Sequence, residues 1–162
     1  MSEAIVLFVT RDGHSRALAL DLGARLGSEV REIGDLEKRK GLFGWLRSGR
    51  QAAMGEATPI GDPQVDLSAV KSVALVQPVW ASAICPPIRT WLRAHEKELD
   101  GKRVAILSSA YSTPPLAIRG KYEAEFGARL GALAACSVVN RKDGPAERER
   151  ALGDFAAELA KR

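Results

Sequence analysis

Ala4-Ile5-Val6-Leu7-Phe8-Val9 is a continuous apolar run that ends at polar Thr10, and Asp12-Gly13-His14-Ser15 follows it. The length of the run and its β-branched and aromatic residues are typical of a strand buried on both faces. Asp-Gly is a turn signal, and a helical pattern with a leucine at every fourth position covers 15–26. A buried strand, a tight turn and a helix form the unit from which parallel α/β sheets are built.

The same alternation continues along the chain. Four more apolar segments predict strands, at 29–33, 73–76, 103–108 and 134–139. Helical patterns predict further helices at 86–99, 115–129 and 145–160. Glycines and prolines interrupt the segment from 34 to 66, so we expect only a short helix near 45–54 inside a long connection.

Five apolar strands that alternate with helices predict an α/β fold, in which helices cover both faces of a parallel sheet. Right-handed crossovers leave few topologies, and the order 2-1-3-4-5 is the common one for five strands. The short, alternating strand at 29–33 suits an edge of this sheet. A length of 162 residues fits one domain over residues 1–162.

The composition argues against several classes of function. The formal charge is only +4 and aromatic residues make up 6%, so the sequence does not predict nucleic-acid binding. The positive balance favours anionic small molecules or an acidic partner. We find no run long enough to span a membrane, no signal peptide at Met1-Ser2-Glu3, and no metal-ligand spacing at Cys85 and Cys136. We therefore expect a reduced, cytoplasmic protein without a metal site.

Ligands of open parallel sheets bind beyond the carboxyl ends of the strands, which here are followed by loops 10–15, 78–87 and 109–115. The first loop leads into a helix N-terminus, where free backbone N–H groups and the macrodipole attract anions. Thr10 and Ser15 add hydroxyl groups, and Gly13 lets the backbone approach a ligand closely. Arg11 and Arg16 add positive charge. This chemistry suits a phosphate monoester, although a capped helix after a tight turn would use the same residues.

The first loop resembles the phosphate-binding loop of flavodoxins, Ser/Thr-x-Thr-Gly-Asn-Thr. Its threonine, glycine and final serine are in register, whereas an aspartate and a histidine replace the second threonine and the asparagine. A Thr-Arg-Asp-Gly-x-Thr loop is also found in the flavodoxin-like bacterial protoporphyrinogen oxidases, which bind flavin. The resemblance implies that the phosphate of flavin mononucleotide (FMN) is held by Thr10, Arg11, Asp12, Gly13, His14 and Ser15. For His14 this role comes from register alone, and a solvent-facing helix residue is the alternative.

Asp12 requires an explanation in such a site. A carboxylate about 4 Å from one phosphate charge costs roughly 4 kcal/mol at an effective dielectric constant near 20. We therefore expect that the side chain points away to cap the helix, or that Arg11 or Arg16 offsets its charge.

The second loop belongs to Pro78-Val79-Trp80-Ala81-Ser82-Ala83-Ile84-Cys85-Pro86-Pro87-Ile88-Arg89-Thr90-Trp91-Leu92. A large aromatic beside small residues can form a slot for a planar ring. The stretch resembles the Pro-Val-Trp-[Ala/Gly]-x-x-x-x-Pro-Pro-[Ile/Val]-Arg-Thr-[Phe/Trp]-Leu signature of small bacterial flavodoxin-family proteins. This implies that the isoalloxazine ring is contacted by Pro78, Val79, Trp80, Ala81, Ser82 and Ala83, with Trp80 flanking it. We interpret Trp91 as a core residue and Cys85 as a structural thiol.

In the third loop, flavodoxins place an aromatic or a glycine-rich stretch that closes over the flavin. Here Tyr111 can stack on the ring, and the hydroxyls of Ser109, Ser112 and Thr113 can bond its pyrimidine edge. The glycines common in relatives are missing from this loop.

The segment 39–50 mixes bulky apolar residues with bases, as a patch for a membrane surface or an acidic partner would. It also resembles Lys-Gly-x-x-Gly-aromatic-Leu-x-Ser-Gly, found at this position in small flavodoxin-family proteins. We interpret it as a family connection that covers the sheet edge.

The resemblance as a whole implies a flavodoxin-like three-layer α/β/α sandwich that binds FMN for electron transfer or a simple reduction. No side chain is needed as a catalytic nucleophile, because the flavin carries the chemistry. The expected partner is a redox protein or a small-molecule electron acceptor, and a homodimer is left open. Two alternatives remain: an NAD(P)H-linked quinone or protoporphyrinogen-type oxidoreductase, and a cofactor-free scaffold for binding or regulation.

Overall fold

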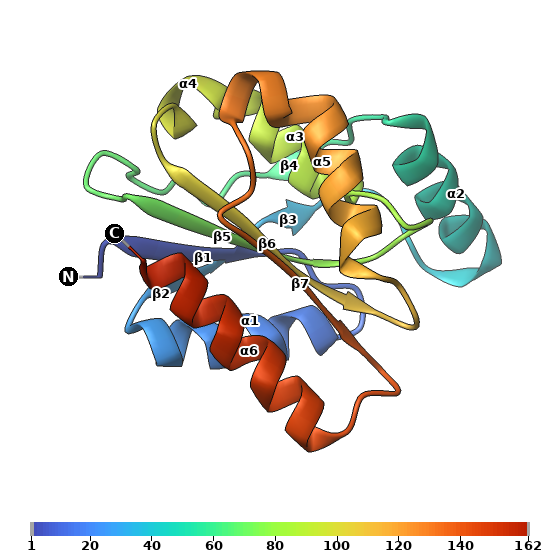
Figure 1. Cartoon of the computed structure of the whole chain (residues 1–162). Helices are drawn as coiled ribbons and strands as arrows, with labels where there is room; N and C mark the ends of the chain where they lie inside the picture. The colour runs from blue at the N-terminus through green and yellow to red at the C-terminus, as the bar shows by residue number, and fades with distance from the viewer. Residues whose placement is uncertain (1, 162) are drawn as a thin grey trace.

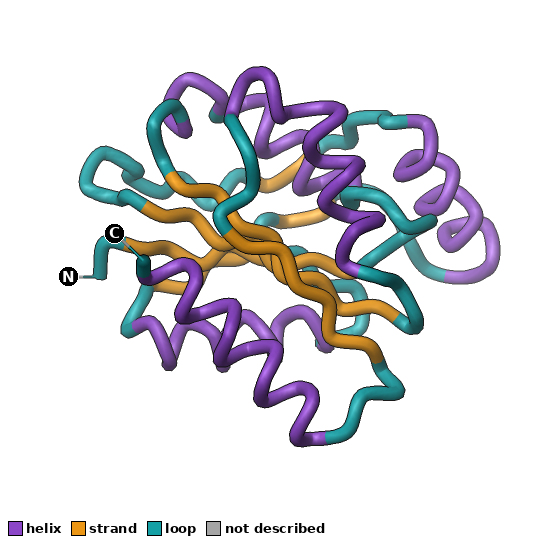
Figure 2. Tube along the Cα trace, viewed as in Figure 1, coloured by secondary structure: helices purple, strands orange, loops and turns teal. Residues whose placement is uncertain are grey.

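Strands and helices alternate along residues 2–161, the part of the chain that the computed structural model describes (Figures 1 and 2). The strands are β1 (Ala4–Phe8), β2 (Glu29–Glu32), β3 (Gly34–Asp35), β4 (Ile60–Gly61), β5 (Ser72–Pro78), β6 (Arg103–Ala110) and β7 (Ala135–Asn140). The helices are α1 (His14–Leu26), α2 (Gly41–Met54), α3 (Pro86–Ala94), α4 (Glu96–Leu99), α5 (Pro115–Leu130) and α6 (Pro145–Ala160).

The main sheet has five strands in the order β2-β1-β5-β6-β7, and every pairing in it is parallel. Without the two-residue strands β3 and β4, this is the predicted order 2-1-3-4-5. In the register of the sheet, Val6 of β1 lies between Val30 of β2 and Ala74 of β5. Strand β2 is an edge, as its alternating sequence predicted, and three of its four residues are exposed.

Helices α1 and α6 cover one face of the sheet, and α3, α4 and α5 cover the other (Figure 1). Under α1 and α6 the core is built around Leu22 and Phe155. On the opposite face it is built around Trp91, Tyr122 and Phe126, each with no exposed surface. The complete burial of Trp91 confirms its interpretation as a core residue.

Helix α2 begins four residues earlier than its sequence predicted, and it does not cover the edge of the sheet. It has 14 residues, and the glycines read as breaks are tolerated within it. Gly44 has a positive reason to be there, because a Cβ would lie 2.3 Å from the backbone carbon of Arg39. The helix packs against α3, beyond the carboxyl ends of the strands, so the expectation that 39–50 covers the sheet edge is wrong.

The predicted helix at 86–99 is interrupted at His95, where α3 ends and α4 begins. The His95 imidazole stacks on Trp91 at 4.6 Å between ring centroids. Its two ring nitrogens lie 2.7 Å from the carboxylates of Asp62 and Glu98. Of these contacts, the one with Asp62 comes from 33 residues away, which the local sequence that predicts a continuous helix does not record.

The connection between β2 and β5 contains one feature that the sequence did not predict. Strands β3 and β4 form a two-stranded antiparallel sheet, in which Gly34 pairs with Gly61 and Asp35 with Ile60. Among residues 2–161, no helix combines the length and apolar character that crossing a membrane requires.

Candidate functional site

The loops that follow β1, β5 and β6 lie together because these strands are neighbours in the sheet. The backbone N–H of Val79 donates to the carbonyl of Ser109 over 2.9 Å, which joins the second loop to the third. The N–H of Val9 donates to the carbonyl of Val76 over 2.9 Å, just before the first and second loops begin. The structure therefore brings the three predicted loops to one end of the sheet.

Local hydrogen bonds shape the first loop. The backbone N–H of Gly13 donates to the Thr10 hydroxyl over 2.9 Å, which closes the turn between β1 and α1. Gly13 itself has φ +93°, a left-handed conformation in which a side chain would be strained. Helix α1 begins at the next residue, so its first N–H groups, which have no partners within the helix, face this turn.

Ser15 is the residue of this loop that most suggests a ligand. It lies in the first turn of α1 and is 1% exposed. Its Oγ is fully buried and has no hydrogen-bond partner among the described residues. Buried hydroxyl groups without a partner are uncommon, because the loss of water is not compensated. A hydroxyl of this kind at a helix N-terminus fits a bound anion that would accept its hydrogen bond.

The charge of Asp12 is offset by a residue that sequence analysis did not identify. One carboxylate oxygen accepts the backbone N–H of His14 over 3.3 Å, although the N-cap of α1 is Gly13, and the other oxygen pairs with Arg141, from the loop after β7. Neither Arg11 nor Arg16 serves as the expected offset. Contacts from other parts of the chain hold both arginines.

Those contacts turn the two arginines away from Asp12. Arg11 donates to the backbone carbonyl of Arg39 over 2.9 Å, toward α2. Arg16 pairs with Glu32 of β2 over 2.7 Å. The remaining polar residue of the loop, His14, faces solvent, with 55% of its side chain exposed. This location agrees with the solvent-facing alternative for His14.

In the second loop, two consecutive residues other than glycine have positive φ: Ala81 (φ +52°) and Ser82 (φ +51°). No other such pair is found among the described residues. The N–H of Ala83 donates to the carbonyl of Trp80 over 3.2 Å, so the turn has the type I′ geometry. Left-handed backbone in a residue with a side chain costs roughly 1–2 kcal/mol. The strain requires support from the surrounding structure, and it lies where ring contacts were predicted.

Gln77 supplies part of that support. It is completely buried at the end of β5, where its amide donates to the hydroxyl of Ser108 over 3.2 Å. Its carbonyl oxygen accepts the backbone N–H of Cys85 over 2.9 Å, which fixes the far end of the loop. Burial raises the pKa of the Cys85 thiol to about 12, so this cysteine is protonated and unreactive at neutral pH. These contacts agree with the structural role predicted for Cys85.

One side of Trp80 is already occupied. The guanidinium carbon of Arg39 lies 4.9 Å from the centroid of the indole ring, a cation–π contact. Arg39 is 7% exposed, and it bonds Asp35 over 2.5 Å and Gln51 of α2 over 2.5 Å. A flavin that Trp80 flanks would therefore have to use the other face or the edge of the indole.

The third loop is the most open of the three. Tyr111 is 79% exposed, and the Ser112 hydroxyl lies 3.5 Å from the ammonium group of Lys142. Thr113 is buried, and its backbone N–H donates to the Asn140 side chain over 2.9 Å. Tyr111 is thus largely exposed to solvent at this end of the sheet.

A cavity of about 440 Å³ lies between the second loop and α2. It is lined by Arg11, by Trp45, Leu46 and residues 48–50 of α2, and by Val79, Trp80 and Ala81. We refer to it as the α2 cavity. The lining takes Arg11 from the first loop and three residues from the second, but neither Ser15 nor the third loop, so the cavity adjoins the three-loop cluster on its α2 side.

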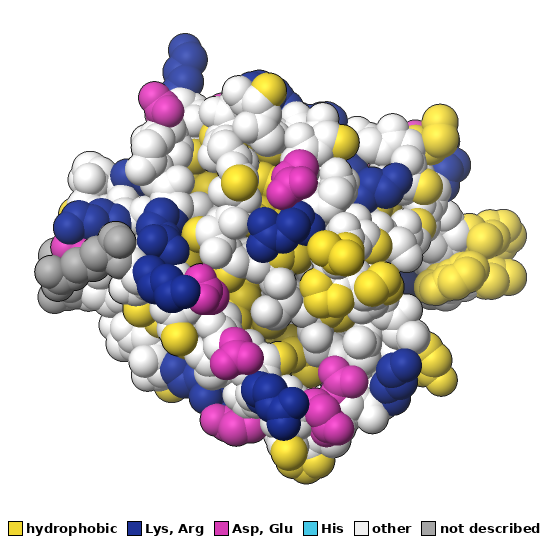
Figure 3. Space-filling model, viewed as in Figure 1, with side chains coloured by type: hydrophobic (Ala, Val, Ile, Leu, Met, Phe, Trp, Pro, Cys, Tyr) yellow, Lys and Arg dark blue, Asp and Glu magenta, His cyan; other side chains and the backbone are white. Residues whose placement is uncertain are grey.

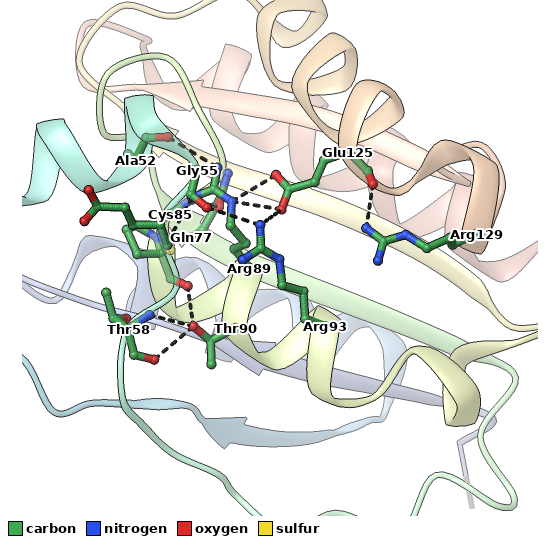
Figure 4. Close-up of polar contacts among 12 residues, drawn as sticks. Ala52, Gly55, Thr58, Gln77, Cys85, Arg89, Thr90, Arg93, Glu125 and Arg129 are labelled. Atoms are coloured by element: carbon green, nitrogen blue, oxygen red, sulfur yellow. Dashed lines mark hydrogen bonds and ion pairs between the residues drawn. The ribbon is translucent and has the colours of Figure 1, made fainter.

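The Arg89-Thr90 pair of the second signature anchors α2 and the chain that follows it (Figure 4). Arg89 is 3% exposed and pairs with Glu125 of α5 at 2.9 Å, while its other nitrogens donate to the carbonyls of Ala52 and Glu56. The Thr90 hydroxyl accepts the backbone N–H of Thr58 over 2.9 Å. Helix C-terminal carbonyls attract cations, so these contacts hold the end of α2 against α3.

No protein-family model and no curated protein matches the chain. Solved structures do match. A "putative flavoprotein" of Bacteroides eggerthii DSM 20697 has 18% sequence identity and a TM-score of 0.77, with all of both chains covered. A flavoprotein of Lactobacillus acidophilus NCFM, in complex with FMN, has 16% identity and a TM-score of 0.69, covering 93% of this chain and 99% of that one. A flavodoxin, WrbA-like protein of Agrobacterium tumefaciens has 13% identity and a TM-score of 0.63, covering 98% and 96%.

The fold is flavodoxin-like. The sequence identified the three loops of this flavodoxin-like fold correctly, but it missed the residues that hold them: Arg39, Gln77 and Arg141. Each of these residues contacts partners that are too far away in the sequence for a local motif to indicate. Arg39 is the only base in 39–50 that is buried in the structure, and nothing in the sequence of this segment distinguishes it from the other three bases. No group of three or more potential ligand side chains is placed to bind a metal among residues 2–161.

Proposed function

We propose that this flavodoxin-like protein binds FMN at its three-loop cluster and uses it for electron transfer or a simple reduction. The observation that carries the proposal is the Ser15 hydroxyl, buried without a partner in the first turn of α1. A phosphate at this position would accept hydrogen bonds from that hydroxyl and from the first backbone N–H groups of the helix.

The remaining residues of the first loop fit a phosphate. Gly13 has no Cβ to obstruct the approach of an anion to the turn. Asp12, the residue least suited to the site, has its charge paired with Arg141 and one oxygen engaged by the His14 N–H. The roughly 4 kcal/mol repulsion calculated for an unpaired carboxylate is therefore largely offset.

The isoalloxazine ring would lie between the second and third loops. Trp80 would flank it with the edge of its indole, since Arg39 covers one face, and the exposed Tyr111 would close over its outer face. Ser109 and Ser112 would bond the polar edge of the ring. Bound FMN supplies the electron-carrying chemistry, while the protein binds and orients the ring and limits its contact with water. The FMN found in the Lactobacillus neighbour supports this choice of cofactor.

For the specific role, we favour reduction of a small molecule over shuttling between proteins. Shuttling flavodoxins are typically very acidic, whereas this chain has a net charge of +4. The α2 cavity offers space for a small molecule beside the predicted ring site. This role corresponds to the alternative of an NAD(P)H-linked quinone or protoporphyrinogen-type oxidoreductase.

The direct experiment is a titration of the purified protein, stripped of any bound flavin, with FMN and with riboflavin, followed by visible absorption. We expect the flavin bands to shift with FMN and binding of riboflavin to be much weaker. Ser15→Ala should weaken FMN binding about tenfold, the loss of one hydrogen bond to a charged group, without changing riboflavin binding.

Thr58→Val is the matched control, because Thr58 also has a buried hydroxyl without a partner, and its backbone hydrogen bonds are to Thr90 of α3 rather than to the first loop. It should leave both affinities unchanged. A protein that takes up no FMN would refute the proposal and favour the cofactor-free scaffold. If Ser15→Ala weakened the binding of FMN and riboflavin equally, Ser15 would not contact the phosphate.

A further inference from the structure

The α2 cavity combines flat apolar walls with one cation that no carboxylate neutralises. Two indoles, Trp45 and Trp80, contribute to its lining, together with Leu46 and Val79. Its volume of about 440 Å³ lies within the range of roughly 300–1,000 Å³ typical of small-molecule sites. Aromatic rings favour a planar guest, since offset stacking adds to the burial of its surface.

Arg11 distinguishes this cavity from a purely apolar hollow. Nη2 of Arg11 donates to the Arg39 carbonyl over 2.9 Å, which holds the guanidinium at the cavity. Its other N–H groups remain available to a ligand. No carboxylate lies within ion-pair distance of Arg11 among residues 2–161. The second cation in the lining, Arg50, is paired with Glu56 at 3.2 Å. An anchored, unneutralised guanidinium beside apolar walls suits the carboxylate of an aromatic acid.

The cavity is separate from the place proposed for the flavin phosphate. Ser15 does not line it, nor do the residues of the third loop. The cavity shares Arg11, Val79, Trp80 and Ala81 with the residues predicted to hold the flavin, and the guanidinium of Arg11 is directed to the α2 side. A molecule in the cavity would therefore lie next to a bound flavin, across the strained turn at Ala81 and Ser82.

We propose that the α2 cavity is a second ligand site, which takes a planar aromatic carboxylate with Arg11 as its anchor. This rests on the proposed function, since it names the class of molecule held beside the flavin. Trp45 and Trp80 bind the ring, and the guanidinium of Arg11 binds the carboxylate.

The test uses 2-naphthoate as the probe and 2-naphthamide as its uncharged isostere. The chain has three tryptophans, so a ¹H–¹⁵N spectrum of the protein resolves three indole N–H signals. We expect 2-naphthoate to shift the signals of Trp45 and Trp80 and leave that of buried Trp91 in place. The amide should bind about tenfold more weakly, because it lacks the charge-assisted contact to Arg11.

Arg11→Met should weaken 2-naphthoate binding to the level of the amide. Arg47→Met is the matched control, since Arg47 is an exposed arginine of α2 that pairs with Glu37 and does not line the cavity. It should bind 2-naphthoate like the unaltered protein. Equal binding of acid and amide, or no change in Arg11→Met, would overturn the proposal.

Repeating the titration in the presence of saturating FMN separates this proposal from the previous one. If 2-naphthoate binds equally well with FMN present, the two sites are distinct as proposed. If FMN displaces it, the cavity is part of the flavin site and the second site is refuted. If FMN does not bind while 2-naphthoate does, the cofactor proposal fails and the carboxylate site stands.

Discussion

The first loop and the α2 region lie at the same end of the sheet, yet they are held in different ways. Two local hydrogen bonds shape the turn of the first loop, from the Gly13 N–H to Thr10 and from the His14 N–H to Asp12, and the long-range contacts of this loop are exposed or half-buried. Helix α2 is anchored by Arg39 at its start and by Arg89 at its end, through partners on β3, α5 and the second loop. Local bonds can be read from a motif, whereas long-range anchors require the whole fold.

The comparison predicts that the largest loss of stability follows from removing a long-range anchor. Arg89→Met should lower the free energy of unfolding by about 3 kcal/mol, because Glu125 and two backbone carbonyls would lose their buried guanidinium partner. Urea denaturation measures this. Arg93→Met is the control, since Arg93 also pairs with Glu125 but is 40% exposed, and should lower it by about 1 kcal/mol or less. Equal losses would show that burial of Arg89 is unimportant.

A smaller effect is expected where α2 approaches Arg39. Gly44→Ala should lower the free energy of unfolding by about 2 kcal/mol, because the new methyl group would overlap the Arg39 backbone. Gly49→Ala, in open space on the same helix, should instead raise it by about 0.5–1 kcal/mol, since alanine favours helix. Thermal unfolding of the two variants tests the opposite signs. If both stabilise the protein, the close approach is not a constraint.

The smallest effect is expected in the first loop. Thr10→Val removes the acceptor of the Gly13 N–H while keeping the shape of the side chain, and water can replace the lost bond at this exposed position. The free energy of unfolding should fall by about 1 kcal/mol or less. Chemical denaturation would measure it beside Arg89→Met. A loss as large as that of Arg89→Met would contradict the distinction between local and long-range anchoring.

The same distinction explains what the sequence could and could not predict. The buried strands, the helices that follow them and the loops at their carboxyl ends were predictable, because each depends on periodicity within a few residues. The length of α2 was not, since its glycines look like breaks until Arg39 is seen packed against Gly44. The break at His95 was equally hidden, because Asp62 supplies one of its partners from 33 residues away.

Within the candidate site, the motif identified the loops but not their electrostatics. Asp12 was recognised as a charge that needs an offset, and Arg11 and Arg16 were the nearest bases in sequence. The structure uses Arg141, which is 129 residues away and follows β7, a strand that β5 and β6 separate from β1. The loops at one end of a parallel sheet can meet even where their strands are not neighbours, so sequence proximity is a poor guide to the pairing of their charges.

The anchoring of α2 also affects how the molecule behaves in solution. Leu42, Phe43 and Trp45 are 60–84% exposed, and the hydrophobic side chains that protrude at the right of Figure 3 lie over this helix. Because the helix is fastened at both ends, it cannot turn these side chains inward. Sulfate strengthens contacts between apolar surfaces, whereas salt screens those between charges. Reversible self-association of the molecule should therefore increase with the concentration of ammonium sulfate, because apolar side chains rather than charges would form the contacts.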